Sequence, residues 1–101
     1  NGYSRERQMG RRDRYKGMVL KPITREMKRV MGVSENFKGL HVAQIKSKSM
    51  ANKAGVLEQD IIIQVEDKEI ESIEEFKEAV KEHGKIRLYV YRRGMIFAVA
   101  F

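Results

Sequence analysis

The chain has 101 residues, of which 42% are hydrophobic and 35% charged, and its formal net charge is +7. A chain of this length supports one core and buries about two-thirds of the surface that its unfolded form exposes, so we expect one domain with one site. Its apolar runs are too short to cross a bilayer, and the absence of cysteine excludes a disulfide framework and a thiolate metal site.

Residues 1–14 are polar, include five arginines and show no apolar period. We expect a flexible basic arm or linker there, followed by the folded domain over residues 15–101. The positive charge suggests acidic partners such as nucleic acid, an anionic membrane surface or acidic peptides. Nucleic-acid binding is the weaker of these interpretations, because Tyr3 stands alone among the arginines where interleaved aromatic residues would be expected.

A strand is predicted to begin at Gly17. Met18 and Leu20 lie on one face of an extended segment that Pro22 ends or places at a sheet edge. Gly17 itself has two interpretations. It either turns the arm into this strand or shapes a loop in which free backbone N–H groups bind a ligand.

A short helix is expected over residues 25–31, because Thr24 is typical of an N-cap and Gly32 of a left-handed C-terminal residue. Alternation over residues 39–45 indicates a half-buried strand, with His41 facing away from the apolar face. Residues 49–53 form about one helical turn that Gly55 ends.

An apolar strand is predicted at residues 60–66, and a short strand at 69–71. Ser72 and Glu75 have the spacing of a capping box, so a helix is expected over residues 73–82. The last element is a hairpin, with arms at 86–92 and 95–101. Together these patterns predict an α+β fold with five or six strands in a small antiparallel or mixed sheet, capped by one long helix and one or two short helices.

Three blocks resemble the PDZ domains of HtrA/Deg (protease Do) serine proteases. Tyr15-Lys16-Gly17-Met18 is similar to the carboxylate-binding loop of that family. Residues 49–62 are similar to its run of small residue, Pro, Ala, Ala-Gly-Leu and Gly-Asp-Val-Ile, although Met50 and Gln59 replace the usual proline and glycine. Residues 67–76 are similar to the turn and groove helix that come next. The resemblance implies a PDZ-like fold, in which the antiparallel or mixed strands form a small β-sandwich or partly open barrel.

The resemblance implies a peptide-binding module that recognises hydrophobic C-termini or extended segments by β-strand addition. A terminal carboxylate would be bound by backbone N–H groups of a loop around Gly17, and the peptide would pair antiparallel with residues 18–21. The implied carboxylate-binding loop consists of Tyr15, Lys16, Gly17 and Met18. The implied groove residues are Val19, Leu20, Ile73, Lys77, Val80 and Lys81.

Specificity is expected to depend on Ile73 and on the groove lysines. Ile73 occupies the position where many PDZ domains use histidine to select Ser or Thr two residues before the ligand terminus, so we expect an apolar residue to be preferred there. The alternative is that Ile73 only anchors the start of the helix. Lys16, Lys77 and Lys81 would favour acidic residues further upstream in the ligand.

No catalytic or cofactor site is expected in this segment. His41 and His83 are isolated, and no nucleophile motif, phosphate loop or metal-ligand spacing is present. The resemblance implies that a separate protease domain carries the activity of an HtrA-type serine endopeptidase in protein quality control. It also implies location in a bacterial periplasm or cell envelope, capture of the C-termini of unfolded or cleaved proteins, and oligomerisation through the parent protein.

Two alternatives remain open from the sequence. The domain could have a structural or oligomer-assembly role, with a blocked or vestigial groove. It could also be the PDZ domain of another protease or of a secretion-system protein.

Overall fold

The computed structural model describes residues 14–81 and 83–101, so residues 1–13 of the predicted arm lie outside the described residues. Within this part of the chain, the fold is an antiparallel sheet with three helices, which confirms the expected α+β class. The strands are β1 (Arg14–Tyr15), β2 (Met18–Pro22), β3 (Leu40–Ile45), β4 (Ile61–Val65), β5 (Lys68–Glu69), β6 (Arg87–Arg92) and β7 (Met95–Ala100), and the helices are α2 (Arg25–Met31), α3 (Met50–Ala54) and α4 (Ile73–Val80).

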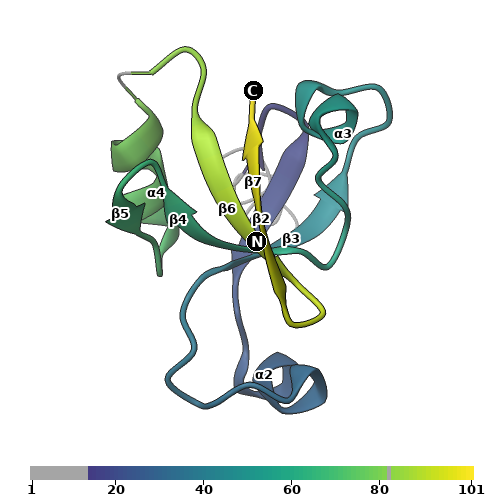
Figure 1. The fold of residues 1–101 in the computed structure, drawn as a ribbon, viewed down its shortest axis with the longest axis vertical. Helices are drawn as coiled ribbons and strands as arrows, with labels where there is room; N and C mark the ends of the chain where they lie inside the picture. Colours follow the sequence, from purple (N-terminus) through teal and green to yellow (C-terminus); the bar gives the residue numbers. More distant parts are fainter. Residues whose placement is uncertain (1–13, 82) are drawn as a thin grey trace, which may run out of the picture.

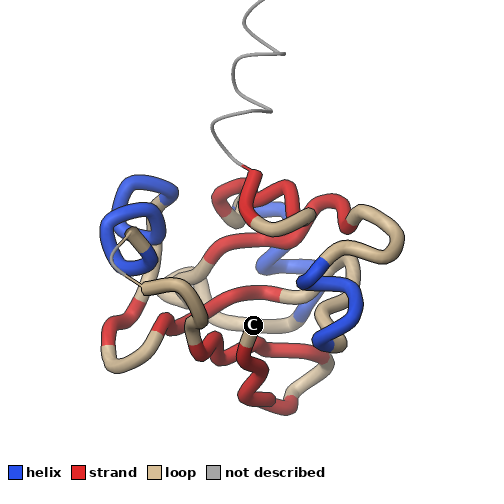
Figure 2. Tube along the Cα trace, turned by 90° about the horizontal axis from the view of Figure 1, so that it is seen from above, coloured by secondary structure: helices blue, strands red, loops and turns tan. Residues whose placement is uncertain are grey.

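The strands are ordered β1-β2-β3-β4-β6-β7, with β5 paired to β4. In Figure 1, α4 and α3 lie on opposite sides of the strands, and α2 lies at the end away from the C-terminus. Figure 2 shows the same separation of α4 from the other two helices across the width of the molecule. Among the described residues, β1 is the strand that was not predicted, and it is only two residues long. β5 is equally short and lies where a short strand was predicted, one residue earlier than expected.

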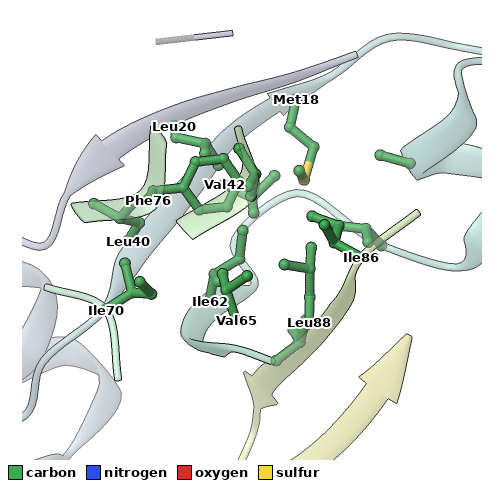
Figure 3. Close-up of a cluster of buried hydrophobic side chains, with 14 of the residues drawn as sticks. Met18, Leu20, Leu40, Val42, Ile62, Val65, Ile70, Phe76, Ile86 and Leu88 are labelled. Atoms are coloured by element: carbon green, nitrogen blue, oxygen red, sulfur yellow. The ribbon is translucent and has the colours of Figure 1, made fainter. Parts of the chain in front are cut away.

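The core lies between the strands and α4 (Figure 3). Side chains from β2, β3 and β6 alternate between this core and the opposite face, as the period of two predicts. In β4, a register shift between Ile62 and Gln64 places Ile62 and Val65 in the same core. The helix contributes Phe76 and Val80, which lie one turn apart on its inner face. The largest fully buried side chains are Phe76, Met18, Leu20, Leu40, Ile61, Ile62, Ile70, Ile86 and Leu88.

Local sequence signals account for the helix ends. The Thr24 hydroxyl accepts a hydrogen bond from the Met27 amide, and Gly32 ends α2 at φ +76°. Ser72 caps α4 as predicted, but the Glu75 carboxylate accepts from the amide of Glu71 rather than from that of Ser72. Helix α4 ends at Val80, short of the predicted limit at residue 82, which lies outside the described residues.

The aspartate of the second motif block has a structural role. Asp60 is buried, and its carboxylate accepts hydrogen bonds from Arg92 Nε at 2.8 Å, from Arg92 Nη2 at 2.6 Å and from the Leu57 amide at 2.9 Å. Arg92 also donates to the Gly55 carbonyl oxygen. The bidentate hydrogen bond to Asp60 raises the pKa of Arg92, and the pair fixes the start of β4 to the end of β6.

The backbone conformation at Gln59 explains why the motif usually has glycine at this position. Its φ is +77°, in the left-handed region where residues with a Cβ are strained. The glutamine side chain makes one compensating contact, with Oε1 lying 2.8 Å from His41 Nε2. The departure from the motif therefore leaves the turn in place, and His41 lies on the face predicted for it.

Candidate functional site

The Lys16-Gly17 pair forms a two-residue hairpin turn between β1 and β2. Both residues have positive φ, +49° for Lys16 and +99° for Gly17, as in the turns that close right-twisted hairpins. Tyr15 lies opposite Met18 across this turn, and Arg14 lies opposite Val19.

The carbonyl groups of the turn face β3 and α3. The Lys16 oxygen accepts from the Ala51 amide at 3.2 Å, and the Gly17 oxygen accepts from the Lys46 amide at 2.8 Å. Because a trans peptide unit is planar, with its N–H opposite its C=O, the amides of Gly17 and Met18 point the other way. They therefore face away from α3 and β3, toward the side of β2 on which β1 lies.

Gly17 is required by space as well as by φ. A Cβ at this position would lie 2.1 Å from the Cβ and 2.3 Å from the Oγ of Ser49, the N-cap of α3. The turn is thus pressed against the start of α3, and any residue larger than glycine must displace one of them.

The Lys16 side chain crosses to the far end of the chain. Its ammonium donates to the main-chain oxygen of Gly84 at 2.6 Å and to that of Phe101 at 2.9 Å. It also lies 5.3 Å from the centroid of the Tyr15 ring and 5.6 Å from that of the Phe101 ring. Lys16 therefore fastens the turn to the segment after α4 and to the chain end, which limits its use as a ligand for a peptide carboxylate.

Helix α4 faces β2 across the core, and several predicted groove residues meet there. Met18, Leu20 and Val80 are buried together in the core cluster, with Ile73 partly buried against it. Val19 is half-buried, whereas Lys77 on α4 and Lys81 at its C-cap are exposed.

Tyr15 connects the turn to α4. Its ring meets the Phe76 ring edge to face, with centroids 5.2 Å apart. Burial raises the pKa of the Tyr15 hydroxyl above its usual value. The sequence predicted Tyr15 to be part of a binding loop. Its contact with Phe76 adds a second role, because it packs that loop against α4.

The outer edge of β2 is partly occupied. A strand has two edges; β3 pairs with one along Met18–Pro22, and β1 pairs with the other at Met18 and Val19. Residues 20–22 have no partner on that side within the described residues. The edge predicted to receive a peptide is therefore open only beyond Val19, and Arg14, assigned from sequence to the arm, is part of β1.

The three groove lysines differ in their surroundings. Lys81 lies 2.6 Å from Glu78, which lowers the pKa of that glutamate through a hydrogen bond. The Lys16 ammonium is held by main-chain oxygens, as described above. Lys77 is exposed and makes no ion pair with any described residue.

The partners of Lys16 and the contact of Gly17 with Ser49 were not predicted from the sequence. Gly84 and Phe101 lie 68 and 85 positions from Lys16, so no local pattern connects them. The only available signal was the unusual lysine itself, at a loop position where the family pattern has an apolar residue.

Within residues 14–81 and 83–101, no group of three or more potential metal ligands is found. No helix in the same residues is long and apolar enough to span a membrane.

Comparisons with known proteins agree with this architecture. The family model of the PDZ domain matches residues 41–93. A 60-residue stretch is 37% identical to serine protease HTRA1 of Xenopus laevis; it covers 59% of this chain but only 13% of that relative.

Two solved structures show the same fold. The HtrA3 PDZ domain bound to a phage-derived ligand, FGRWV, has a TM-score of 0.74 at 24% identity, covering 87% of this chain and 82% of that one. The HtrA-type protease AlgW with decapeptide has a TM-score of 0.69 at 21% identity, covering 85% of this chain and 27% of that one.

Proposed function

The chain belongs to the PDZ domain family, and from this premise we propose that it is a peptide-binding module that takes hydrophobic C-termini or extended segments as an added strand on β2. The observation that carries the proposal is the direction of the Gly17 and Met18 amides. Both point away from β3 and α3, to the side of β2 on which β1 lies, because the carbonyl groups of the same peptide units accept from Ala51 and Lys46 on the other side. Backbone N–H groups gathered in this way compensate the desolvation of a carboxylate.

The bound peptide would run antiparallel to β2, between this strand and α4. Its terminal side chain would lie against Met18, Leu20 and Val80, which already form one apolar cluster. At Met18 and Val19 the peptide competes with β1 for the same edge. A two-residue strand pair has little stability of its own, so exchange of β1 for a longer ligand strand is feasible.

Two side chains on α4 set the proposed preference. Ile73 offers an apolar contact and no hydrogen bond to the ligand residue two positions before the terminus, so an apolar residue is preferred there. Lys77 is the groove lysine best placed to attract an acidic residue further upstream. As an exposed charge, it contributes about 1 kcal/mol or less and acts mainly on the rate of association.

In the whole protein, this module would capture substrates for, or regulate, an attached serine protease of the HtrA type. The relative at 37% identity supports this role, although the chain spans only 13% of that protein's length. The C-termini of unfolded or cleaved proteins in a bacterial periplasm or envelope would then be its partners, in a protein quality-control pathway.

One observation favours a second candidate function. Because β1 already occupies part of the β2 edge, the groove could be permanently closed, which would leave the domain a structural or assembly role. The two functions differ in whether β1 can be exchanged for a peptide.

Amide NMR titration of the 101-residue chain with a hydrophobic C-terminal peptide distinguishes the two. We expect the largest shifts at Gly17, Met18 and Val80, with further shifts at Tyr15 as β1 leaves the edge. The same peptide with an amidated C-terminus is the control and should bind at least about tenfold more weakly, because a hydrogen-bonded charge is lost. Absence of shifts at saturating peptide would favour the closed groove.

A second titration tests the role of Ile73. In the variant Ile73→His, we expect a gain in affinity for peptides with Ser or Thr two residues before the terminus, relative to apolar ones. An unchanged order of preference would show that Ile73 only anchors α4.

A further inference from the structure

Strand β7 is the edge of the sheet opposite to β1. It pairs with β6 residue for residue over Met95–Ala100, without a bulge, and no described strand pairs with its far side. In Figure 1 it is the yellow strand that leads to the C-terminus. An edge of this length presents a regular row of backbone donors and acceptors.

The hydrogen bonds at the end of the hairpin fix which residues form that row. Ile86 and Phe101 exchange both main-chain bonds, at 2.9 and 3.0 Å. In an antiparallel pair the bonded positions alternate, so Val99, Phe97 and Met95 also direct their main chain toward β6. Ile96, Ala98 and Ala100 therefore direct their N–H and C=O groups to the open edge.

The same three residues have exposed side chains. Ile96 is 61% exposed, and Ala98 and Ala100 are exposed beside it. The run from Gly94 to Phe101 is the longest in the chain without an ionisable side chain. Charged residues, prolines and bulges normally protect sheet edges, and β7 has none of them.

We propose that β7 pairs antiparallel with β7 of a second copy of this chain, about a two-fold axis through Ala98. In this register, Ala98 faces its own copy, and Ile96 of each chain faces Ala100 of the other. Each of the three pairs exchanges two main-chain hydrogen bonds. The large side chain of Ile96 lies against the small side chain of Ala100 on both sides of the axis, as a self-complementary two-fold interface requires.

The absence of charge along the β7 edge favours a second copy over a charged partner. Two molecules of net charge +7 repel one another on most of their surface, whereas the β7 edge brings no ionisable side chain of Gly94–Phe101 against another. A six-residue edge buries less than the roughly 1,200 Å² of a stable interface, so the dimer is weak, with a Kd on the order of 0.1–1 mM.

The register can be tested with two single-cysteine variants, because the chain contains no cysteine. In Ala98→Cys, the two thiols face each other across the axis, with Cα atoms about 5.5 Å apart. In Ala100→Cys, they are displaced by four residues along the strand, about 13 Å. Both sites are exposed in the same strand and should tolerate the change equally.

A bis-maleimide shorter than that displacement is applied to each variant at about 0.5 mM protein, near the expected Kd. We expect Ala98→Cys to cross-link roughly tenfold faster than Ala100→Cys, because pairing raises the effective concentration of its thiol. Equal rates, faster reaction of Ala100→Cys, or no dimer from either would overturn the proposal. The experiment contains no peptide ligand, so its outcome is independent of the groove.

Discussion

The replacement of Gly17 by alanine separates the two reasons for a glycine at the turn before β2. The chain contains a matched site in Gly94, which is also the second residue of a two-residue hairpin turn, after Arg93 at φ +51°. Gly94 has φ +83°, and a Cβ added there would have no neighbour within 4 Å, whereas a Cβ added at Gly17 would lie 2.1 Å from the Cβ of Ser49. Gly94→Ala thus measures backbone strain alone.

We expect Gly94→Ala to lower the free energy of unfolding by about 1–2 kcal/mol, the penalty for a left-handed residue with a Cβ. Gly17→Ala has the same strain, and relief of the overlap with Ser49 adds about 1–3 kcal/mol. A total of about 2–5 kcal/mol is a large part of the roughly 5–15 kcal/mol that holds a small domain folded. Urea denaturation followed by circular dichroism measures both values.

The double variant Gly17→Ala/Ser49→Gly completes the experiment. Glycine at 49 removes the overlapping atoms and, as an N-cap, costs only a few tenths of a kcal/mol. We expect it to recover most of the difference between the two alanine variants, together with the amide shifts that peptide causes at Met18. If Gly17→Ala is no less stable than Gly94→Ala, the turn is not pressed against α3 and the argument fails.

Three further predictions concern stability. Asp60→Asn should lower the free energy of unfolding by about 2–4 kcal/mol, because it leaves the partly buried Arg92 guanidinium without its counter-charge. Glu78→Gln breaks an exposed pair of the same 2.6 Å length and should leave the urea midpoint nearly unchanged. Equal losses of stability in urea titrations of the two variants would contradict this reasoning. Gln59→Gly should raise the melting temperature, since relief of the +77° φ outweighs one exposed hydrogen bond, and a lower melting temperature would refute it. Burial raises the pKa of Tyr15 in the folded state, so the folded state holds this proton more tightly and stability should fall as pH rises through the unfolded pKa of about 10. Tyr15→Phe should reduce that fall. An identical loss of stability at alkaline pH in both proteins would contradict the role given to Tyr15.

Elements controlled by neighbouring residues were predictable from the sequence. Caps at Thr24 and Ser72 and the alternation in β3 and β6 act over a few positions, and each lies where the pattern indicated. The family motif added a proposed position for the carboxylate-binding loop, which remains a prediction, because the spacing of the motif reflects three-dimensional constraints that single residues do not show.

Features that depend on distant residues were not predictable. β1 has two residues, too few for any alternation, and it exists because the turn folds it back onto β2. The Lys16 ammonium reaches oxygens that become neighbours only in the finished sheet. The pairing of Asp60 with Arg92 spans 32 positions, and nothing in the sequence distinguishes that arginine from the neighbouring one.

The attachment of Lys16 to Phe101 also bears on the order of folding. A contact between residues 85 positions apart closes nearly the whole described chain into one loop, and its entropic cost is met only after the intervening elements have formed. The loop proposed to bind the carboxylate would therefore acquire its final geometry late. A partly folded molecule would present β2 without a fastened turn, so only completely folded copies would be competent to capture a chain end.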